Sequence, residues 1–507
     1  MSSERKVMRD STASLVVRLL LLILLGVAVL ASVASLYIRT RQTAFADPIL
    51  QARMLIKDRF VREVDDQRLQ MGAVAGMIAA LDDPYSFFVE QTDTSEFHKA
   101  MLGEYVGIGV SVELIDGVLT VVTPLDESPA LKAGVRAGDE IVRIDDADTK
   151  GMTLDDAAAH LTGAPGTNIT IIVNRKGDQL PITITRAEIT TQTVKGIIRE
   201  GSDSAWRYML DPVNNIAYIR ITQFNPTTSV ELRDALEAAT NTYGEIRGLI
   251  IDLRSNPGGI LDEAVAVADD FLDRGTILST KGRGFAEETF RAREGHIIPS
   301  TAPIAVLIDG QSASASEILS GTLVESKRAI AVGERTFGKG SVQGMYLLPS
   351  EKGEIKLTEQ LYYLPSGRTV QKRDGDPTWG VDPSPGFAVP LTEEHQILMR
   401  NARERFDVIS DDSPIRANAT AAELVTQRAD PQLSRAYEAV LAHVTTGIWP
   451  EVKDYATSVD MAGASDPEAG LPVGTRLKAA QQYREFLVTE LSRMDLQIEK
   501  LSTSPDN

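Results

Sequence analysis

The chain of 507 residues contains no cysteine. Disulfide bonds, thiolate metal sites and cysteine nucleophiles are therefore excluded. Histidine is also scarce. The five histidines are far apart in the sequence and do not have the spacing of metal ligands: His98, His160, His296, His395 and His443. Because neither residue type forms a cluster, we expect no metal site and no cofactor.

Basic residues are the scarcer of the two charge types. Lys and Arg number 52 against 71 Asp and Glu, which gives a formal net charge of −19. A protein whose main partner is nucleic acid carries a basic surface instead. We therefore expect no nucleic-acid partner.

Long apolar runs are rare, and the one that stands out lies near the N-terminus. Residues 19–38, LLLLILLGVAVLASVASLYI, contain no charge. As a helix they would span about 30 Å, the thickness of a bilayer's hydrocarbon core. The excess of basic residues in 1–18 favours a cytoplasmic N-terminus and a single-pass signal-anchor, with the body of the chain on the periplasmic side of the cell membrane. The small residues 32–34 leave open a cleaved signal peptide and a secreted body.

Changes in composition and in the spacing of apolar residues divide the rest of the chain into four regions. Residues 44–102 have the apolar spacing of helices. Residues 103–188 form short β-branched runs broken by Gly and Asp, which predicts a small β-rich domain. Between 193 and 390, apolar strands alternate with helical stretches, which predicts an α/β layer with largely parallel strands. Residues 391–507 are polar and helical, with an amphipathic helix at 476–501.

Three Gly- or Ser-rich loops follow three strands of the α/β region. GLIIDL leads into RSNPGG (254–259), IAVLID into GQSASASEI (310–318), and AIAV into GERTFGKG (333–340). Sites in open α/β sheets form where strands end at the carboxyl edge. We therefore expect these loops to meet in one site.

The second loop carries three serines, Ser312, Ser314 and Ser316, which alternate with alanine just before a helix. A serine with an acidic residue close behind is typical of a helix N-cap, but a cap needs only one serine. A serine at a helix N-terminus also suits a nucleophile, because the helix dipole stabilises negative charge that develops nearby. Capping and catalysis are both open at this point.

The third loop is similar at first to a phosphate-binding loop, G-x-x-x-x-G-K-[ST]. Gly340 follows Lys339, however, and the residues beyond have no helical period. The magnesium ligand and the helix of such a loop are therefore missing. A serine nucleophile needs a base, and a lysine can act as one when burial lowers its pKa towards neutrality. Lys339 is the candidate base, with Gln343 to orient its amine, and a solvated lysine in a Gly-flanked turn is the alternative.

SASASEI, TFGKGSVQ and the upstream LRSNPGG resemble the carboxy-terminal processing, or tail-specific, proteases. The resemblance covers residues 47–385 and includes GMIAALDDPYSFF, GEYVGIGV and SPALKAGVRAGDEIVRID. It implies a multidomain α/β protein: a crotonase-like α/β protease core with an inserted β-rich PDZ domain. The N-terminal transmembrane helix and a helical C-terminal extension would complete the chain. One departure is Ser384, where the family often has Asp.

Position by position, the resemblance makes Ser314 the nucleophile, Lys339 the general base and Gln343 the residue that steadies the lysine. The implied activity is that of a serine endopeptidase that cleaves envelope proteins at or near their C-termini. A catalytically inactive PDZ adaptor and a small-ligand-binding protein on the same fold are the alternatives. The adaptor is disfavoured because all three residues are present.

The resemblance also implies an oxyanion hole and a peptide groove. The hole would use the N–H groups of Ala315 and Gly259, with Gly258 as the second choice. The PDZ domain would bind polypeptide substrates by their free C-termini. Its implied groove residues are Tyr105, Val106, Gly107, Ile108, Gly109 and Val110. For the helix at 476–501, self-association into a homo-oligomer and docking on its own domain are both open.

Overall fold

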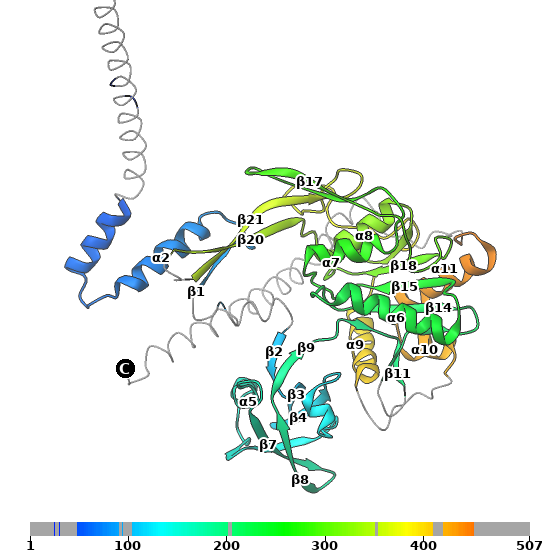
Figure 1. Cartoon of the computed structure of the whole chain (residues 1–507), viewed down its shortest axis with the longest axis horizontal. Coiled ribbons are helices and arrows are strands. Elements are labelled where there is room, and N and C mark those ends of the chain that lie inside the picture. The colour runs from blue at the N-terminus through cyan, green and yellow to red at the C-terminus, as the bar shows by residue number, and fades with distance from the viewer. Residues whose placement is uncertain are drawn as a thin grey trace, which may run out of the picture. The chain divides into compact units, whose positions relative to one another are not determined.

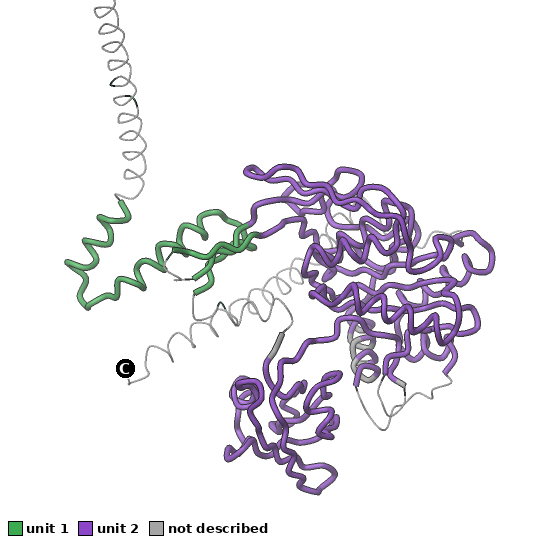
Figure 2. Tube along the Cα trace, viewed as in Figure 1, with its two compact units in different colours: residues 1–94, 344–357 green, residues 95–343, 358–507 purple. Residues whose placement is uncertain are grey.

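The structure is a computed structural model that describes residues 25, 30, 48–90, 94, 104–200, 205–349, 353–408 and 419–450. The chain divides into two compact units (Figure 2). One consists of Met1–Thr94 and Gly344–Leu357, and the other of Ser95–Gln343 and Thr358–Asn507. All three loops predicted to form the site lie in the second unit.

A six-stranded sheet forms the centre of the α/β region. Its strands are β10 (Val194–Lys195), β13 (Met209–Asp211), β14 (Ile216–Ile221), β15 (Gly248–Asp252), β18 (Ile304–Ile308) and β19 (Ala329–Gly333). Strands β14, β15, β18 and β19 are parallel neighbours in that order, whereas β10 and β13 pair antiparallel with β14. Strands β14, β15 and β18 are buried at every position, which explains their continuous apolar sequences.

Three helices cover one face of this sheet (Figure 1). They are α6 (Thr228–Tyr243), α7 (Leu261–Asp269) and α8 (Ala315–Glu325), close to the predicted positions. Alternate strand residues, such as Ile219, Ile251 and Val306, share a core with them. This face is therefore built from segments that follow one another along the chain, as the strand–helix alternation predicts.

The opposite face is covered by helices from the C-terminal region. They are α9 (Glu393–Asp407), α10 (Ala421–Gln427) and α11 (Pro431–Thr446). The other set of alternate strand residues, including Tyr218, Ile250 and Leu307, shares a second core with them. The predicted boundary at residue 390 therefore does not separate these helices from the protease core. The sheet has a second apolar face, and the helices up to Thr446 bury it.

The remaining strands of the α/β region form hairpins. They are β11 (Ile198–Glu200), β12 (Ala205–Arg207), β16 (Thr276–Gly282), β17 (Phe285–Arg291), β20 (Ser341–Leu347) and β21 (Gly353–Tyr363). Strand β11 pairs with β12, β16 with β17 and β20 with β21, all consecutive in the chain. β16 also pairs antiparallel with the end of β21, through residues 361–363. This last pairing brings Tyr362 into the second unit, where it reaches the candidate site.

The first unit contains helical residues 48–59, helix α2 (Asp66–Ala79) and strand β1 (Phe87–Glu90). β1 pairs antiparallel with residues 353–356 of β21. The prediction of a wholly helical region over 44–102 is therefore wrong at β1. Pro84 disfavours helix at the residue before it, and the FFVE segment that follows finds hydrogen-bonding partners on β21.

The β-rich region is a separate small fold with its own core. An antiparallel sheet has the order β3-β4-β5-β7-β8, with β6 beside β5, and β2 pairs with β9. The strands are β2 (Glu104–Gly107), β3 (Val110–Ile115), β4 (Val118–Pro124), β5 (Glu140–Ile144), β6 (Ala147–Asp148), β7 (Asn168–Arg175), β8 (Asp178–Thr185) and β9 (Ala187–Thr190). Its helices are α4 (Pro129–Lys132) and α5 (Leu154–Leu161), the latter at the predicted position.

Two predicted segments cannot be compared with this fold. The expected transmembrane segment 19–38 lies outside the described residues except for Leu25 and Leu30, and the amphipathic helix 476–501 lies wholly outside them. Among the residues that the structure does describe, no helix combines the length and the apolar character needed to cross a bilayer.

Candidate active site

The three predicted loops follow three adjacent parallel strands. The glycine loop (254–259) comes after β15, the serine loop (309–314) after β18, and the lysine loop (334–340) after β19. Parallel strands end at one edge of the sheet, so the loops emerge together, as predicted. Hydrogen bonds join them directly: Ala313 N donates to Asn256 O at 3.0 Å, and Phe337 N donates to Ser312 O at 3.0 Å.

Only the middle serine of the three is partly exposed. Ser312 and Ser316 are fully buried. The Ser312 hydroxyl donates to the carbonyl oxygen of Leu253, just after β15, at 2.8 Å, and the Ser316 hydroxyl donates to that of Asn256, in the glycine loop, at 3.0 Å. Ser314 is half-buried and stands at the N-cap of α8. The alternating pattern thus assigns two serines to loop packing and leaves Ser314 as the reactive candidate.

Ser314 has a strained main chain, with φ 54° and ψ −115°. Such a conformation is costly for a residue with a Cβ atom and persists only where the surroundings impose it. A nucleophilic serine on a sharp strand-to-helix turn shows this kind of geometry, because the turn exposes the hydroxyl at the edge of the sheet. Ser314 therefore does stand at a helix N-cap, but capping alone does not explain its strained main chain.

A buried carboxylate joins the serine loop to the lysine loop. Glu317, in the first turn of α8, is fully buried. Its Oε2 accepts from the main-chain N–H groups of Ser314 (2.9 Å) and Lys339 (2.8 Å). Its Oε1 accepts from the Thr336 hydroxyl (2.6 Å) and Gly338 N (2.7 Å). Because one oxygen binds both nitrogens, the main chains of Ser314 and Lys339 lie side by side.

Glu317 has no cation among these four partners. Burial raises its pKa to about 7, although the Thr336 hydroxyl and the main-chain N–H groups oppose the rise by favouring the charged form. All four partners are donors, so the ionised carboxylate satisfies the arrangement best. The link between the two loops therefore depends on a group that titrates near neutral pH.

Tyr362 makes a second connection between the same two residues. Its hydroxyl lies 3.1 Å from the carbonyl oxygen of Ser314 and 2.5 Å from that of Lys339. The tyrosine side chain is almost entirely buried. Glu317 thus holds the two N–H groups and Tyr362 the two carbonyl groups, which fixes the relative placement of the two residues.

The glycines beside Lys339 are required by close packing. Gly338 has φ 93°, and a Cβ atom there would lie 2.6 Å from Trp379 Cδ1. A Cβ atom at Gly340 would lie 2.6 Å from Gln371 N. Lys339 itself is half-buried. The loop is therefore packed on both sides of the lysine.

Gln343 lies on β20, four residues beyond the lysine. Its amide nitrogen donates to Ser341 Oγ at 2.8 Å and to Thr358 Oγ1 at 3.3 Å. These bonds hold the side chain at the base of the lysine loop. Its action on the Lys339 amine stays a prediction.

The glycine loop brings main-chain N–H groups to the serine. Gly258 has φ 102°, and a Cβ atom there would lie 2.7 Å from both Ala313 O and Ser314 Cβ. The Gly258 N–H donates to Asn256 Oδ1 at 2.9 Å, however, and is already engaged. This leaves the N–H of Gly259 as the better candidate for an oxyanion donor, beside that of Ala315 in the first turn of α8.

Sequence reasoning missed two residues of this site. Glu317 is visible in SASASE, but its acid is equally typical of a capping box, and the contacts with the lysine loop have no sequence signature. Tyr362 lies in a strand, LYYLP, with no pattern that marks it. Over the described part of the chain, no three His, Cys, Asp or Glu residues gather as metal ligands.

The β-rich region contains a groove of about 450 Å³ between β3 and α5. The edge position of β3 in its sheet leaves it available for pairing with an added strand. Of the residues predicted for peptide binding, the groove is lined by Val106, Gly107, Ile108, Gly109 and Val110. The main chain of Tyr105 pairs with Ile189 of β9.

Sequence comparison matches three family models to this chain. Peptidase family S41 matches residues 215–384, and the PDZ domain matches residues 106–185. The N-terminal domain of the activating protease CtpB matches residues 38–93. The first match contains all three loops, and the second contains the part of the groove that is lined by residues 106–162.

Individual relatives extend over most of the chain. The carboxy-terminal-processing protease of Bartonella bacilliformis is 34% identical over 404 residues, 78% of this chain and 88% of the relative. The carboxy-terminal processing protease CtpA of Bacillus subtilis is 32% identical over 367 residues, 70% of this chain and 75% of the relative. Among solved structures, a photosystem II D1 C-terminal processing protease is 28% identical and covers 66% of this chain and 84% of its own, with a TM-score of 0.39.

The fold and these matches define a serine-type peptidase that carries a PDZ domain. The chain belongs to the carboxy-terminal processing proteases of peptidase family S41.

Proposed function

We propose that Ser314 and Lys339 are the catalytic dyad of this protease. The observation that carries the proposal is the double connection of their main chains, through Glu317 on the N–H side and Tyr362 on the carbonyl side. Two residues whose main chains are held by the same pair of buried groups keep a fixed separation at the backbone, which a nucleophile and its base require.

The reaction follows from these positions. Ser314 Oγ attacks the carbonyl carbon of the scissile peptide bond while neutral Lys339 Nζ takes the hydroxyl proton. The tetrahedral oxyanion is stabilised by the N–H groups of Ala315 and Gly259. The C–N bond then breaks as the Lys339 ammonium gives its proton to the leaving amine. Water, deprotonated by Lys339, attacks the acyl carbon. The bond from that carbon to Ser314 Oγ breaks, Oγ takes the proton back from the Lys339 ammonium, and the product acid leaves and ionises to a carboxylate.

Gln343 is proposed to steady Lys339. An amide whose nitrogen is engaged as a donor, as in its bonds to Ser341 and Thr358, offers its carbonyl oxygen to an ammonium. This arrangement would hold the lysine during the step in which it carries the extra proton.

The PDZ domain is proposed to hold the C-terminal tail of a polypeptide substrate. Pairing with the edge strand β3 would supply main-chain affinity, and the groove beside α5 would accept side chains. Gly109 has φ 75°, and a Cβ atom there would lie 2.4 Å from Ser128 Cβ, so the turn before β3 requires glycine. A tail held there has a raised effective concentration near the protease core.

Cellular location follows from the N-terminal sequence alone. We propose that residues 19–38 anchor the protein in the cell membrane and that the catalytic body acts on envelope proteins from the periplasmic side. The crotonase-like α/β arrangement of the protease core and self-association through residues 476–501 stay predictions.

The dyad is tested with Ser314→Ala and Lys339→Ala. Each should reduce hydrolysis of an unfolded polypeptide by several orders of magnitude, and the double variant should lose little more, because the two residues act as a unit. Lys281→Ala serves as the matched control, since Lys281 is a half-exposed lysine on β16. Substantial turnover by either single variant, with native thermal unfolding, would refute the dyad.

A further inference from the structure

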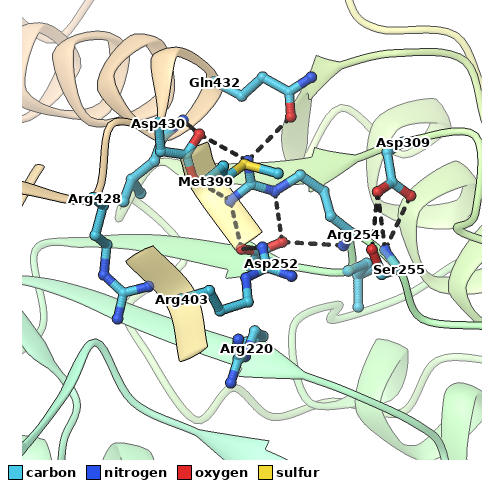
Figure 3. Close-up of polar contacts among 12 residues, drawn as sticks. Arg220, Asp252, Arg254, Ser255, Asp309, Met399, Arg403, Arg428, Asp430 and Gln432 are labelled. Carbon is cyan, nitrogen blue, oxygen red and sulfur yellow. Dashed lines mark hydrogen bonds and ion pairs between the residues drawn. The ribbon is translucent and has the colours of Figure 1, made fainter. Parts of the chain in front are cut away.

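Arg254, at the start of the glycine loop, is buried between two carboxylates (Figure 3). Its Nε and Nη2 donate to the two oxygens of Asp252, at 2.9 and 2.7 Å. Its Nη1 and Nη2 donate to the two oxygens of Asp430, at 2.8 and 2.7 Å. Nη1 also donates to Gln432 Oε1 at 3.0 Å. All five N–H donors of the guanidinium are thereby engaged.

The second carboxylate comes from a distant part of the chain. Asp430 is separated from Arg254 by 176 residues and is the N-cap of α11, where it accepts from Leu433 N at 2.9 Å. Its neighbour Gln432 donates to Val389 O at 2.8 Å. Helix α11 is packed against the sheet by its buried apolar residues. The place of the Asp430 carboxylate is therefore set by helix packing and not by the loop that it contacts.

Asp252 and Arg254 keep their opposite charges in the neutral pH range. Burial alone would raise the pKa of Asp252, but Arg254 and Arg403 outweigh burial and hold that pKa well below its usual range. Burial alone would lower the pKa of Arg254, but Asp252 and Asp430 reverse the effect and raise it. A charge-assisted, bidentate arrangement of this kind fixes direction as well as distance.

Hydrogen bonds hold Ser255, Asn256 and the N–H of Gly258, which follow Arg254 in the glycine loop. Ser255 has φ 60°, and its N–H donates to both oxygens of Asp309 at 3.0 Å. Asn256 Nδ2 donates to Ile221 O at 2.8 Å, and Asn256 Oδ1 accepts from Gly258 N. A displacement of Arg254 would therefore also shift the main-chain N–H groups of Gly258 and Gly259, which lie only four and five residues further along the loop.

We propose that Asp430 is a positioning residue for catalysis, which acts through Arg254 on the main-chain N–H groups of the glycine loop. The inference rests on the proposed oxyanion hole. Donors in such a hole act only within about 2.7–3.1 Å of the oxyanion, and a misplacement of about 1 Å can cost roughly a hundredfold in rate. The C-terminal helices are thus part of the catalytic apparatus and not an accessory to it.

The test is Asp430→Asn in the full chain. Asparagine keeps an oxygen for the Leu433 N–H but removes the charge and the second acceptor of Arg254. We expect kcat to fall about 10- to 100-fold while KM stays within about twofold, because the oxyanion exists only in the transition state. A peptide boronate, whose tetrahedral adduct places an oxygen in the hole, should lose affinity by the same factor.

Two further variants keep the test decisive. Val440→Ala shortens a buried side chain of α11 that lies away from Arg254, and it should lower stability without lowering kcat. Gln432→Met removes one acceptor of Arg254 and should lower kcat in the same direction but less. It replaces Asp430→Asn as the test if that variant does not fold.

An unchanged kcat in the folded test variant, or an equal loss in Val440→Ala at matched stability, would overturn the inference. Retained boronate affinity together with a lower kcat would overturn it as well. These results leave the dyad untouched, because the dyad is refuted only by turnover in Ser314→Ala or Lys339→Ala.

Discussion

Glu317 and Arg254 are both buried, both ionisable and both bind loops of the candidate site, but their charges are compensated differently. Glu317 accepts from four donors, and none of the four is a charged side chain. Arg254 is enclosed by the carboxylates of Asp252 and Asp430. The first holds the serine and lysine loops together, and the second holds the glycine loop.

The difference decides which loops respond to pH. A carboxylate compensated only by dipoles retains a large cost of burial, so the pKa of Glu317 rises to about 7. An arginine between two carboxylates stays ionised, and the pKa of Asp252 is held well below its usual range. The connection between Ser314 and Lys339 is therefore sensitive to pH near neutrality, whereas the support of the glycine loop is not.

The largest effect is expected where the paired charge is removed. Arg254→Met removes the cation between two buried carboxylates and leaves Asp252 with only the longer contact to Arg403, at 3.4 Å. The free energy of unfolding should fall by about 3–5 kcal/mol. The loss should be the same at pH 6 and pH 8, as measured by denaturant unfolding. Arg233→Met is the matched control, because its ion pair with Asp270 is half exposed and should contribute at most about 1 kcal/mol. Similar losses of unfolding free energy in Arg254→Met and Arg233→Met would contradict the prediction that the buried ion pair contributes more than the exposed one.

The carboxyl group of Glu317, which has no cation beside it, should make the stability of the protein depend on pH. The pKa of Glu317 in the folded state, about 7, lies above its ordinary value of 4.5, so the folded protein holds a proton that the unfolded chain releases. Stability should therefore fall as pH rises from about 4.5 to 7 and then level off, by up to about 3 kcal/mol. Glu317→Gln cannot titrate, so the difference in unfolding free energy between variant and wild type should change across that window. Parallel profiles from pH 5 to 8 would contradict this.

A smaller effect is expected when one hydrogen bond to Glu317 is removed. Thr336→Val removes one of the four donors to Glu317 and leaves Val381 N, which donates to the Thr336 hydroxyl at 2.7 Å, without its acceptor. We expect a loss of about 1–2 kcal/mol in unfolding free energy. Because the lost donor favours the charged form, the pH midpoint assigned to Glu317 should move upwards. Thr322→Val, which removes a single buried hydrogen bond to Ile277 O, is the control and should leave that midpoint in place.

The parts of this fold that sequence predicts well are those with local signals. The parallel strands, α6 to α8, and the three loops at one edge follow from apolar runs and Gly- or Ser-rich turns. Ser314 and Lys339 stand out for the same reason, because small residues flank them where close packing requires it. Family resemblance then added their roles, which the residues alone left open.

The parts that sequence did not predict depend on contacts between distant residues. Tyr362 and Asp430 reach the site from segments far from the loops, and neither lies in a motif. The second apolar face of the sheet calls for a cover, but nothing in the strands specifies that α11 supplies it. Strand β1 was taken for helix, because its partner lies over 260 residues away on β21.

The place of α11 in the chain has a consequence for the order of biosynthesis. A polypeptide is made from its N-terminus, and its domains generally fold in that order. Ser314 and Lys339 leave the ribosome before Asp430, and the second face of the sheet stays uncovered until residues 431–446 have been made. Nascent chains therefore contain Ser314 and Lys339 well before Arg254 gains its second carboxylate. We expect the growing chain to hydrolyse peptides more slowly until Asp430 has been made and α11 covers the sheet.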